Sequence, residues 1–111
     1  MLTCAGEAAA RFDCRLETTA RATMEPYRHR RSDLVVTLAR EALEAAGYAP
    51  REEQVGGGAD AHVLQAGGLP SIVLSSGMLD VHTPGEHIHA EDIHGLARLT
   101  VELIRAAARR L

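Results

Sequence analysis

The alternation of apolar and polar residues divides the chain into a leading segment and a longer block with a regular pattern. Residues 5–12 are rich in alanine, which favours a short helix. Residues 14–24 alternate small or β-branched residues with charged ones, which predicts a strand with one face in water. A polar, proline-containing connector follows over residues 25–33. We therefore expect one helix and one strand before the main block.

The main block begins with a helical pattern that has clear start and stop signals. Asp33 is expected to cap the N-terminus of this helix, and Gly47 is expected to end it. A second, brief helix is predicted to open at Asp60 and to end at Gly67 and Gly68. The apolar stripe predicted for the first helix consists of Leu34, Val35, Leu38, Ala42, Leu43 and Ala46.

Two strands and a final helix complete the predicted elements. Residues 51–55 predict a short strand, and residues 71–75 predict a buried strand that is apolar on both faces. A loop over residues 76–89 leads to the last helix. The predicted stripe of that helix is Ile93, Leu96, Ala97, Thr100, Leu103, Ile104, Ala107 and Leu111.

A strand, a helix and a strand in close succession form a βαβ unit, which implies a parallel sheet with helices on its faces. We therefore predict an α/β fold with a partial parallel sheet and flanking helices. Ligands bind such sheets beyond the carboxyl ends of the strands. Two segments leave the predicted strands there, namely the glycine turn at residues 56–58 and the loop at residues 76–89. Functional residues are expected in these two segments.

Composition narrows the class of protein. The chain has 111 residues, of which 46% are hydrophobic and 24% are charged, as in an ordinary soluble domain. No apolar run approaches the roughly 20 residues that a membrane span needs. A net charge of −3 argues against nucleic acid as a partner. Two cysteines without a secretory signal predict a cytoplasmic protein with reduced thiols.

Several polar clusters allow more than one interpretation. The glycine turn lacks the lysine and the spacing of a phosphate-binding loop. The connector residues from Arg28 to Arg31 are consistent with anion binding or with a solvated linker. Ser75 and Ser76 lack the flanking glycines of a nucleophile elbow that would pair them with His82 as a base.

The histidines after the second predicted strand are candidate metal ligands. A self-contained zinc site would use His82, Glu86, His87 and His89, because structural zinc needs four ligands in tetrahedral positions. His87 and His89 would point the same way in an extended segment. Exposed surface histidines are the alternative interpretation.

The order and spacing of the motifs in the second half resemble a known enzyme family. These motifs are Gly56-Gly57-Gly58-Ala59-Asp60-Ala61-His62, Gly68-Leu69-Pro70, Ser76-Gly77-Met78, His82-Thr83-Pro84-Gly85-Glu86 and Glu91-Asp92-Ile93. Together they resemble the C-terminal part of the zinc metallopeptidases that include peptidase T, carboxypeptidase G, aminoacylase and succinyl-diaminopimelate desuccinylase. Peptidase T-like members are the most similar. The resemblance covers residues 25–108, and also residues 5–24 as the end of the lid domain.

This resemblance implies a domain division and roles for single residues. Residues 1–24 would be a remnant of the lid (dimerisation) domain, and residues 25–111 the C-terminal part of the catalytic domain. His82 stands at the position of the family's last metal ligand, and Glu86 at the acidic position of the same motif. Gly57 and Gly58 stand where the family's glycine-rich turn lines the substrate cleft.

Three positions depart from the family pattern. Ala59 replaces the usual serine, His62 replaces the usual asparagine, and His89 replaces a frequent serine cap. Polar contacts at these positions are therefore expected to differ from those of the family.

The resemblance also implies what this chain lacks. The family uses two zinc ions, and its other ligands come from an H-x-D motif and a D-E-E-type segment upstream of the lid. No H-x-D occurs here, and Glu52-Glu53 lies after a helix rather than before the lid. The catalytic residues are therefore unknown, and we expect the chain alone to be inactive and to hold zinc poorly.

Two classes of function remain open at this stage. The first is a fragment or split subunit of a zinc exopeptidase or amidohydrolase that hydrolyses small peptides or N-acyl amino acids, with a homodimer allowed for the complete enzyme. The second is a non-catalytic fragment or interaction module that has lost the metal site.

Overall fold

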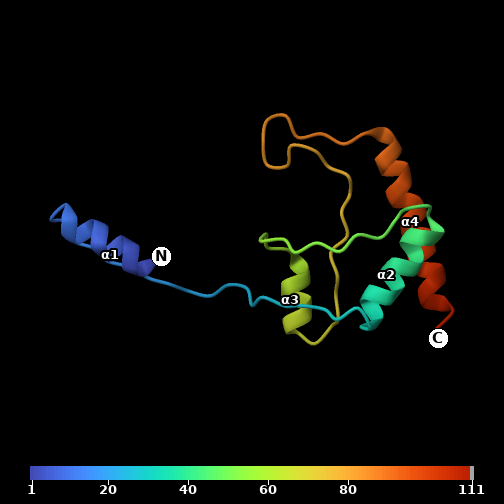
Figure 1. Ribbon diagram of the computed structural model, residues 1–111, viewed down its shortest axis with the longest axis horizontal. Coiled ribbons are helices and arrows are strands. Elements are labelled where there is room, and N and C mark those ends of the chain that lie inside the picture. The colour runs from blue at the N-terminus through green and yellow to red at the C-terminus, as the bar shows by residue number, and fades with distance from the viewer. Residues whose placement is uncertain (111) are drawn as a thin grey trace.

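The structure is a computed structural model that describes residues 1–110, and it is elongated. Over these residues it contains the helices α1 (Leu2–Arg11), α2 (Leu34–Ala45), α3 (Asp60–Ala66) and α4 (Ala90–Ala108). Helix α1 lies at the end of a long extended segment, far from the other helices (Figure 1). The radius of gyration is 19.7 Å, whereas a compact domain of this length has about 13 Å. Only the part from residue 25 onward gathers into a body.

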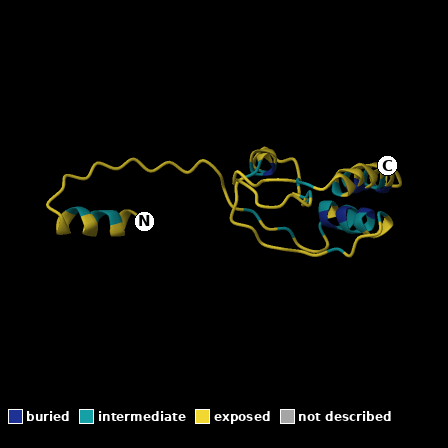
Figure 2. Ribbon diagram, turned by 90° about the horizontal axis from the view of Figure 1, so that it is seen from above, coloured by how far each residue is buried: buried dark blue, intermediate teal, exposed yellow. Residues whose placement is uncertain are grey.

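The best-packed part of that body is the contact between α2 and α4, the one pair of helices in contact among the described residues. Val36, Ala39 and Ala42 of α2 are buried, as are Leu99 and Ala106 of α4. Figure 2 shows the buried residues collected mainly where these two helices face each other. Three of these five buried residues are alanines, so the contact is made mostly by small side chains.

The predicted faces of both helices need correction. Of the stripe predicted for α2, only Ala42 is buried, and Leu34 is 55% exposed. In α4, Ile93 and Ile104 are exposed rather than buried, and Leu111 lies outside the described residues. The prediction followed the larger side chains, whereas the contact is made largely by alanines.

The helix boundaries agree with the predictions. The predicted helix at residues 5–12 is present as α1, although it begins earlier, at Leu2. Helix α2 begins directly after Asp33, although the Asp33 side chain makes no capping hydrogen bond, and Gly47 follows its last turn with a φ of +89°. The Tyr48 N–H donates to the Leu43 carbonyl at 2.8 Å, and the Gly47 N–H to Glu44 at 3.1 Å. This pair of bonds is a Schellman motif, which favours glycine at the left-handed position.

The α/β prediction is wrong for this structure. Within residues 1–110 no sheet forms, and the single bridge joins Leu79 to His87 in antiparallel fashion. Residues 14–24, 51–55 and 71–75, which were predicted to be strands, are extended segments that pair with no neighbour. Val55 and Val73 are 72% and 53% exposed. Isolated short strands are marginal in water unless further strands or a packed face support them.

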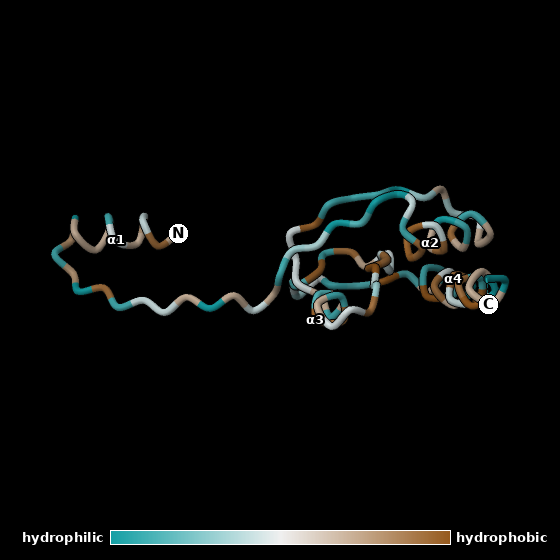
Figure 3. The backbone as a smooth tube through the Cα atoms, turned by 90° about the horizontal axis from the view of Figure 1, so that it is seen from below, coloured by the Kyte–Doolittle hydropathy of each residue, from teal (hydrophilic) through white to brown (hydrophobic). Residues whose placement is uncertain are grey.

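The leading segment is separate from the packed body. Helix α1 has no buried residue, and residues 13–26 are exposed throughout. Figure 3 shows its apolar positions scattered along a thin tube, with no second element beside them. No helix in residues 1–110 combines the length and apolar character that crossing a membrane requires.

Candidate functional site

The loop that carries His82 is closed by hydrogen bonds at its base. The Leu79 N–H donates to the His87 carbonyl at 2.9 Å, and the His87 N–H donates to Leu79 at 3.2 Å. Inside the loop, Thr83 donates to the Asp80 carbonyl through its N–H at 3.1 Å and through its hydroxyl at 2.7 Å. These bonds define a compact turn over residues 79–87, which we call the His82 loop.

His82 itself sits in an unusual backbone conformation. Its φ is +66°, in the left-handed region, and that of Asp80 is +51°. For residues other than glycine this conformation costs roughly 1–2 kcal/mol, and such strain concentrates at functional sites. The His82 N–H donates to the Glu86 carboxylate at 2.8 Å, which holds the strained residue in place. His82 is exposed, so its ring is accessible to a ligand.

Glu86 therefore orients the loop through the backbone of His82. The only bond recorded between the two residues within the described chain runs to the backbone N–H.

The neighbouring histidines do not complete a metal site. His87 directs Nδ1 to the Gly85 carbonyl at 2.7 Å, and the same atom lies 4.0 Å from Asp80 Oδ2. The His87 and His89 rings meet edge to face with centroids 5.7 Å apart. Among residues 1–110, no three histidine, cysteine, aspartate or glutamate side chains converge where they could hold a metal ion. Catalytic zinc needs three protein ligands, so His82 supplies at most one of the required donors.

The glycine turn at residues 56–58 is exposed. A Cβ at Gly57 would meet open space, whereas a Cβ at Gly58 would lie 2.6 Å from Met24 Sδ. Gly58 thus allows the Met24 side chain to approach the turn closely.

The residues that follow the turn make contacts that the sequence analysis missed. His62 Nδ1 lies 3.2 Å from the Ala59 N–H, and the His62 ring meets Tyr27 edge-on with centroids 4.9 Å apart. Tyr27 also meets His29 at 5.2 Å, and His29 Nε2 donates to the Ser71 carbonyl at 2.7 Å. The contacts of Tyr27 with His62 and of His29 with Ser71 join residues 35 and 42 positions apart, so no local sequence pattern indicates them.

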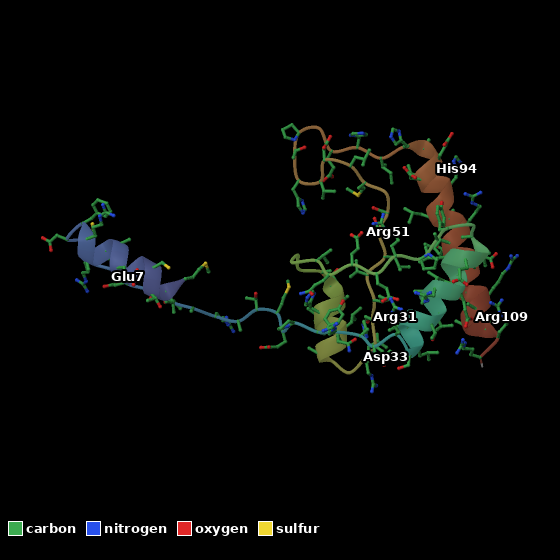
Figure 4. The ribbon with its side chains drawn as sticks, viewed as in Figure 1. Glu7, Arg31, Asp33, Arg51, His94 and Arg109 are labelled. Atoms are coloured by element: carbon green, nitrogen blue, oxygen red, sulfur yellow. The ribbon has the colours of Figure 1, made fainter. Side chains whose placement is uncertain are left out.

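Glu52, the first residue of the acidic pair Glu52-Glu53, is ion-paired with two arginines. Its carboxylate accepts hydrogen bonds from Arg31 at 3.1 Å and Arg40 at 2.9 Å. Desolvation raises the pKa of Glu52, but the two guanidinium groups together outweigh it, and the pKa is lowered. A carboxylate held ionised between two arginines is a poor general base. Figure 4 shows Arg31 close to the start of α2, beside Asp33.

The arginines of the connector are paired as well. The Arg30 N–H hydrogen-bonds the Asp33 carboxylate at 2.9 Å, which lowers the pKa of Asp33 against its partial desolvation. The Arg30 guanidinium adds a second bond at 3.1 Å. Pairing of Arg30 and Arg31 with carboxylates supports the linker interpretation over anion binding.

Comparison with known proteins identifies the family to which this chain belongs. The sequence matches the family described as peptidase family M20/M25/M40 over residues 8–106. The chain belongs to this family. The resemblance stated from the motifs is thereby confirmed, and peptidases of this family are generally metal-dependent.

Two curated relatives show how much of a family member the chain represents. It is 30% identical to the uncharacterized protein YqjE of Bacillus subtilis (strain 168) over 103 residues, which are 93% of this chain and 28% of the relative. It is 33% identical to Peptidase T of Geobacillus kaustophilus (strain HTA426) over 85 residues, or 77% of this chain and 20% of the relative. The chain therefore spans less than a third of either protein. No solved structure matches it.

Proposed function

We propose that this chain is the C-terminal part of a zinc-dependent peptidase or amidohydrolase that acts on small peptides or N-acyl amino acids. In this proposal His82 is a zinc ligand, and Gly57 and Gly58 line the substrate cleft. The observation that carries the proposal is the backbone of His82, whose left-handed φ of +66° is held by a hydrogen bond to Glu86. An exposed imidazole on a residue whose backbone is strained, within a closed loop, is suited to bind a ligand.

The donor set of this chain does not fit a zinc centre by itself. Zinc would activate water for attack on a carbonyl in the complete enzyme, but one imidazole cannot retain the metal. The remaining ligands and the general base would have to come from the part of the enzyme that the relatives contain beyond this match. The chain alone is therefore proposed to be catalytically incomplete. A complete, cytoplasmic enzyme that forms a homodimer is consistent with this proposal.

A chimaera tests the role of His82 directly. The matching segment of the Geobacillus kaustophilus Peptidase T would be replaced by the matching segment of this chain, and zinc content and peptide hydrolysis would be measured. We expect His82→Ala to lose one zinc ion and nearly all hydrolysis. His87→Ala is the matched control, because His87 lies in the same loop and already bonds Gly85. Normal zinc content and rate in the His82→Ala chimaera would reject the assignment.

A second candidate function is a non-catalytic interaction module. It is favoured by the large exposed apolar side chains, of which Val73 and Ile104 are 53% and 65% exposed. A polypeptide partner could cover such residues. If the chimaera with intact His82 folds but binds no zinc, this second function becomes the better account.

A further inference from the structure

Helix α4 has two apolar faces, of which one is buried against α2. Leu99 and Ala106 are buried on that face. The second face follows steps of four and three residues along the helix, and each of its positions is exposed. These positions are Ile93, Ala97, Thr100, Ile104 and Ala107. The sequence predicts burial for this second face, so a partner is needed to bury it.

The second face is continuous along α4. Ile93 and Ile104 are 53% and 65% exposed, and Val101 beside them is 46% exposed. Figure 2 shows exposed residues on the side of α4 that is turned away from α2. The helix has 19 residues, which corresponds to a length of about 28 Å. Single exposed apolar side chains are common on soluble proteins, but a continuous apolar patch marks an interaction site.

The spacing of these positions is that of a face that packs against another helix. Steps of four and three residues keep a row of side chains on one side of a helix over several turns. Ala97 and Thr100 are small, and they lie between Ile93 and Ile104. Small side chains at the centre of a contact allow two helices to approach closely, and the isoleucines on either side add apolar area. The face therefore fits a helix that has the same pattern.

The charges at the two ends of α4 indicate which helix that is. Glu91 and Asp92 lie in the first turn, and Arg105 lies in the last turn. An antiparallel second copy of α4 would set the acidic turn of each copy beside the basic turn of the other, whereas a parallel copy would set like charges together. The antiparallel arrangement also places opposite ends of the two helix dipoles side by side. Helix α4 is therefore complementary to itself in charge and in pattern, as an interface with two-fold symmetry requires.

We propose that this chain pairs with a second copy of itself through the exposed face of α4, with the two helices antiparallel. The symmetric register places Ile93 of one copy beside Ile104 of the other, and Ala97 beside Thr100. The contact of α4 with α2 is retained, because the residues buried there lie on the other face. This pairing goes beyond both proposed functions, since it requires neither zinc at His82 nor loss of the metal site.

Sedimentation velocity of the full chain, without added metal, tests the pairing. Between about 1 and 100 μM, the range expected for a small interface, the unmodified chain should change from monomer to dimer. Ile104→Glu would bury a charge against Ile93 of the second copy, so the dissociation constant should rise about tenfold or more. Val63→Glu is the matched control, because Val63 on α3 is also 65% exposed and lies outside the proposed interface.

Circular dichroism separates pairing from folding of the single chain. Ile104 is exposed in the single chain. At concentrations below those at which chains pair, Ile104→Glu should therefore keep the helical signal of the unmodified chain. Loss of pairing with an unchanged helical signal reports on the interface itself.

Disulfide cross-linking tests the orientation, in a background where the exposed Cys4 and Cys14 are replaced by serine. A mixture of Ile93→Cys and Ile104→Cys should form a cross-linked dimer under mild oxidation, because antiparallel helices place these two positions side by side. Neither variant should cross-link by itself, since each thiol would then face an isoleucine of the second copy.

A chain that stays monomeric over this concentration range would overturn the proposal and would leave the face to the remaining part of the enzyme. Equal pairing in Ile104→Glu and in the unmodified chain would overturn it as well. Cross-linking of either cysteine variant by itself would reject the antiparallel arrangement. Failure of His82 to bind zinc in the chimaera would instead reject the proposed function and leave this pairing intact.

Discussion

The backbone N–H of His82 donates a 2.8 Å hydrogen bond to the carboxylate of Glu86, four residues further along the same loop. The bond satisfies a backbone donor in a strained conformation and leaves the imidazole free. It links a histidine and a glutamate four residues apart through the backbone of one and the side chain of the other.

Removal of the Glu86 carboxylate should loosen the His82 loop. Glu86→Ala leaves the His82 N–H without its acceptor, and a hydrogen bond of this kind contributes about 1 kcal/mol, or about a fivefold change in local opening. Hydrogen exchange at His82 and at His87, whose N–H closes the loop base, would show the faster opening. Glu86→Gln is the control, since its amide oxygen still accepts the bond. Equal exchange in the alanine and glutamine variants would contradict this explanation.

The contact between Tyr48 and Gly95 should make an alanine unfavourable at position 95. A Cβ on Gly95 would lie 2.0 Å from the Tyr48 hydroxyl, so the ring would have to move. Alanine is otherwise favoured over glycine in a helix by about 1 kcal/mol. In a double-mutant cycle followed by urea unfolding, Gly95→Ala should be less favourable with Tyr48 than in a Tyr48→Ala background. Additive effects of the two substitutions would show that the contact does not constrain α4.

Leu99 should carry much of the stability of the α2–α4 contact. Leu99 is 4% exposed and Ile104, on the same helix, is 65% exposed. Truncation of a buried leucine costs about 2–5 kcal/mol, which would melt the helix pair in a body this small. Leu99→Ala should lose helical circular dichroism at 25 °C, whereas Ile104→Ala should change stability by no more than about 0.5 kcal/mol. Similar losses in both variants would place the core on the other face of α4.

The ion pairs of Glu52 should make the free energy of unfolding decrease as the pH is lowered into the acid range. Because the folded state lowers the pKa of Glu52, its contribution is present above the ordinary glutamate value of about 4.3. That contribution is lost as the pH falls through the lower pKa of the folded state. Glu52→Gln should therefore destabilise the chain at pH 7, the difference should shrink as the pH falls below the ordinary glutamate value, and added salt should also reduce it. Glu53→Gln, whose partner Arg51 is 3.8 Å away, should have a smaller effect.

The helices were predictable because their signals are local. Asp33 and Gly47 mark the two ends of α2, and the Schellman bonds at Gly47 follow from glycine's freedom at positive φ. The buried faces were not predictable, because Ala39 and Ala106 carry weak apolar signals although both are buried. The prediction of a sheet was wrong because a strand at residues 71–75 would need neighbouring strands, and none is present within the described residues.

Some features of the candidate site could likewise be predicted from the sequence, and others could not. The position of His82 on a loop, and its link to Glu86, follow from spacing within one motif. The contact of His62 with Tyr27 depends on a chain reversal between them, and no local pattern records it. The substitution of His62 for the family's asparagine was visible in the sequence, but its partner was not.

The most direct test of the central claim is the metal content of this chain after dialysis, combined with an assay against a panel of di- and tripeptides. The claim is that His82 is one ligand of a zinc centre whose other ligands lie outside this chain. We expect far less than one zinc ion per chain and no hydrolysis, because a catalytic zinc ion needs three protein ligands. Stoichiometric zinc together with turnover that disappears in His82→Ala would contradict the claim, since it would require a complete site within these residues.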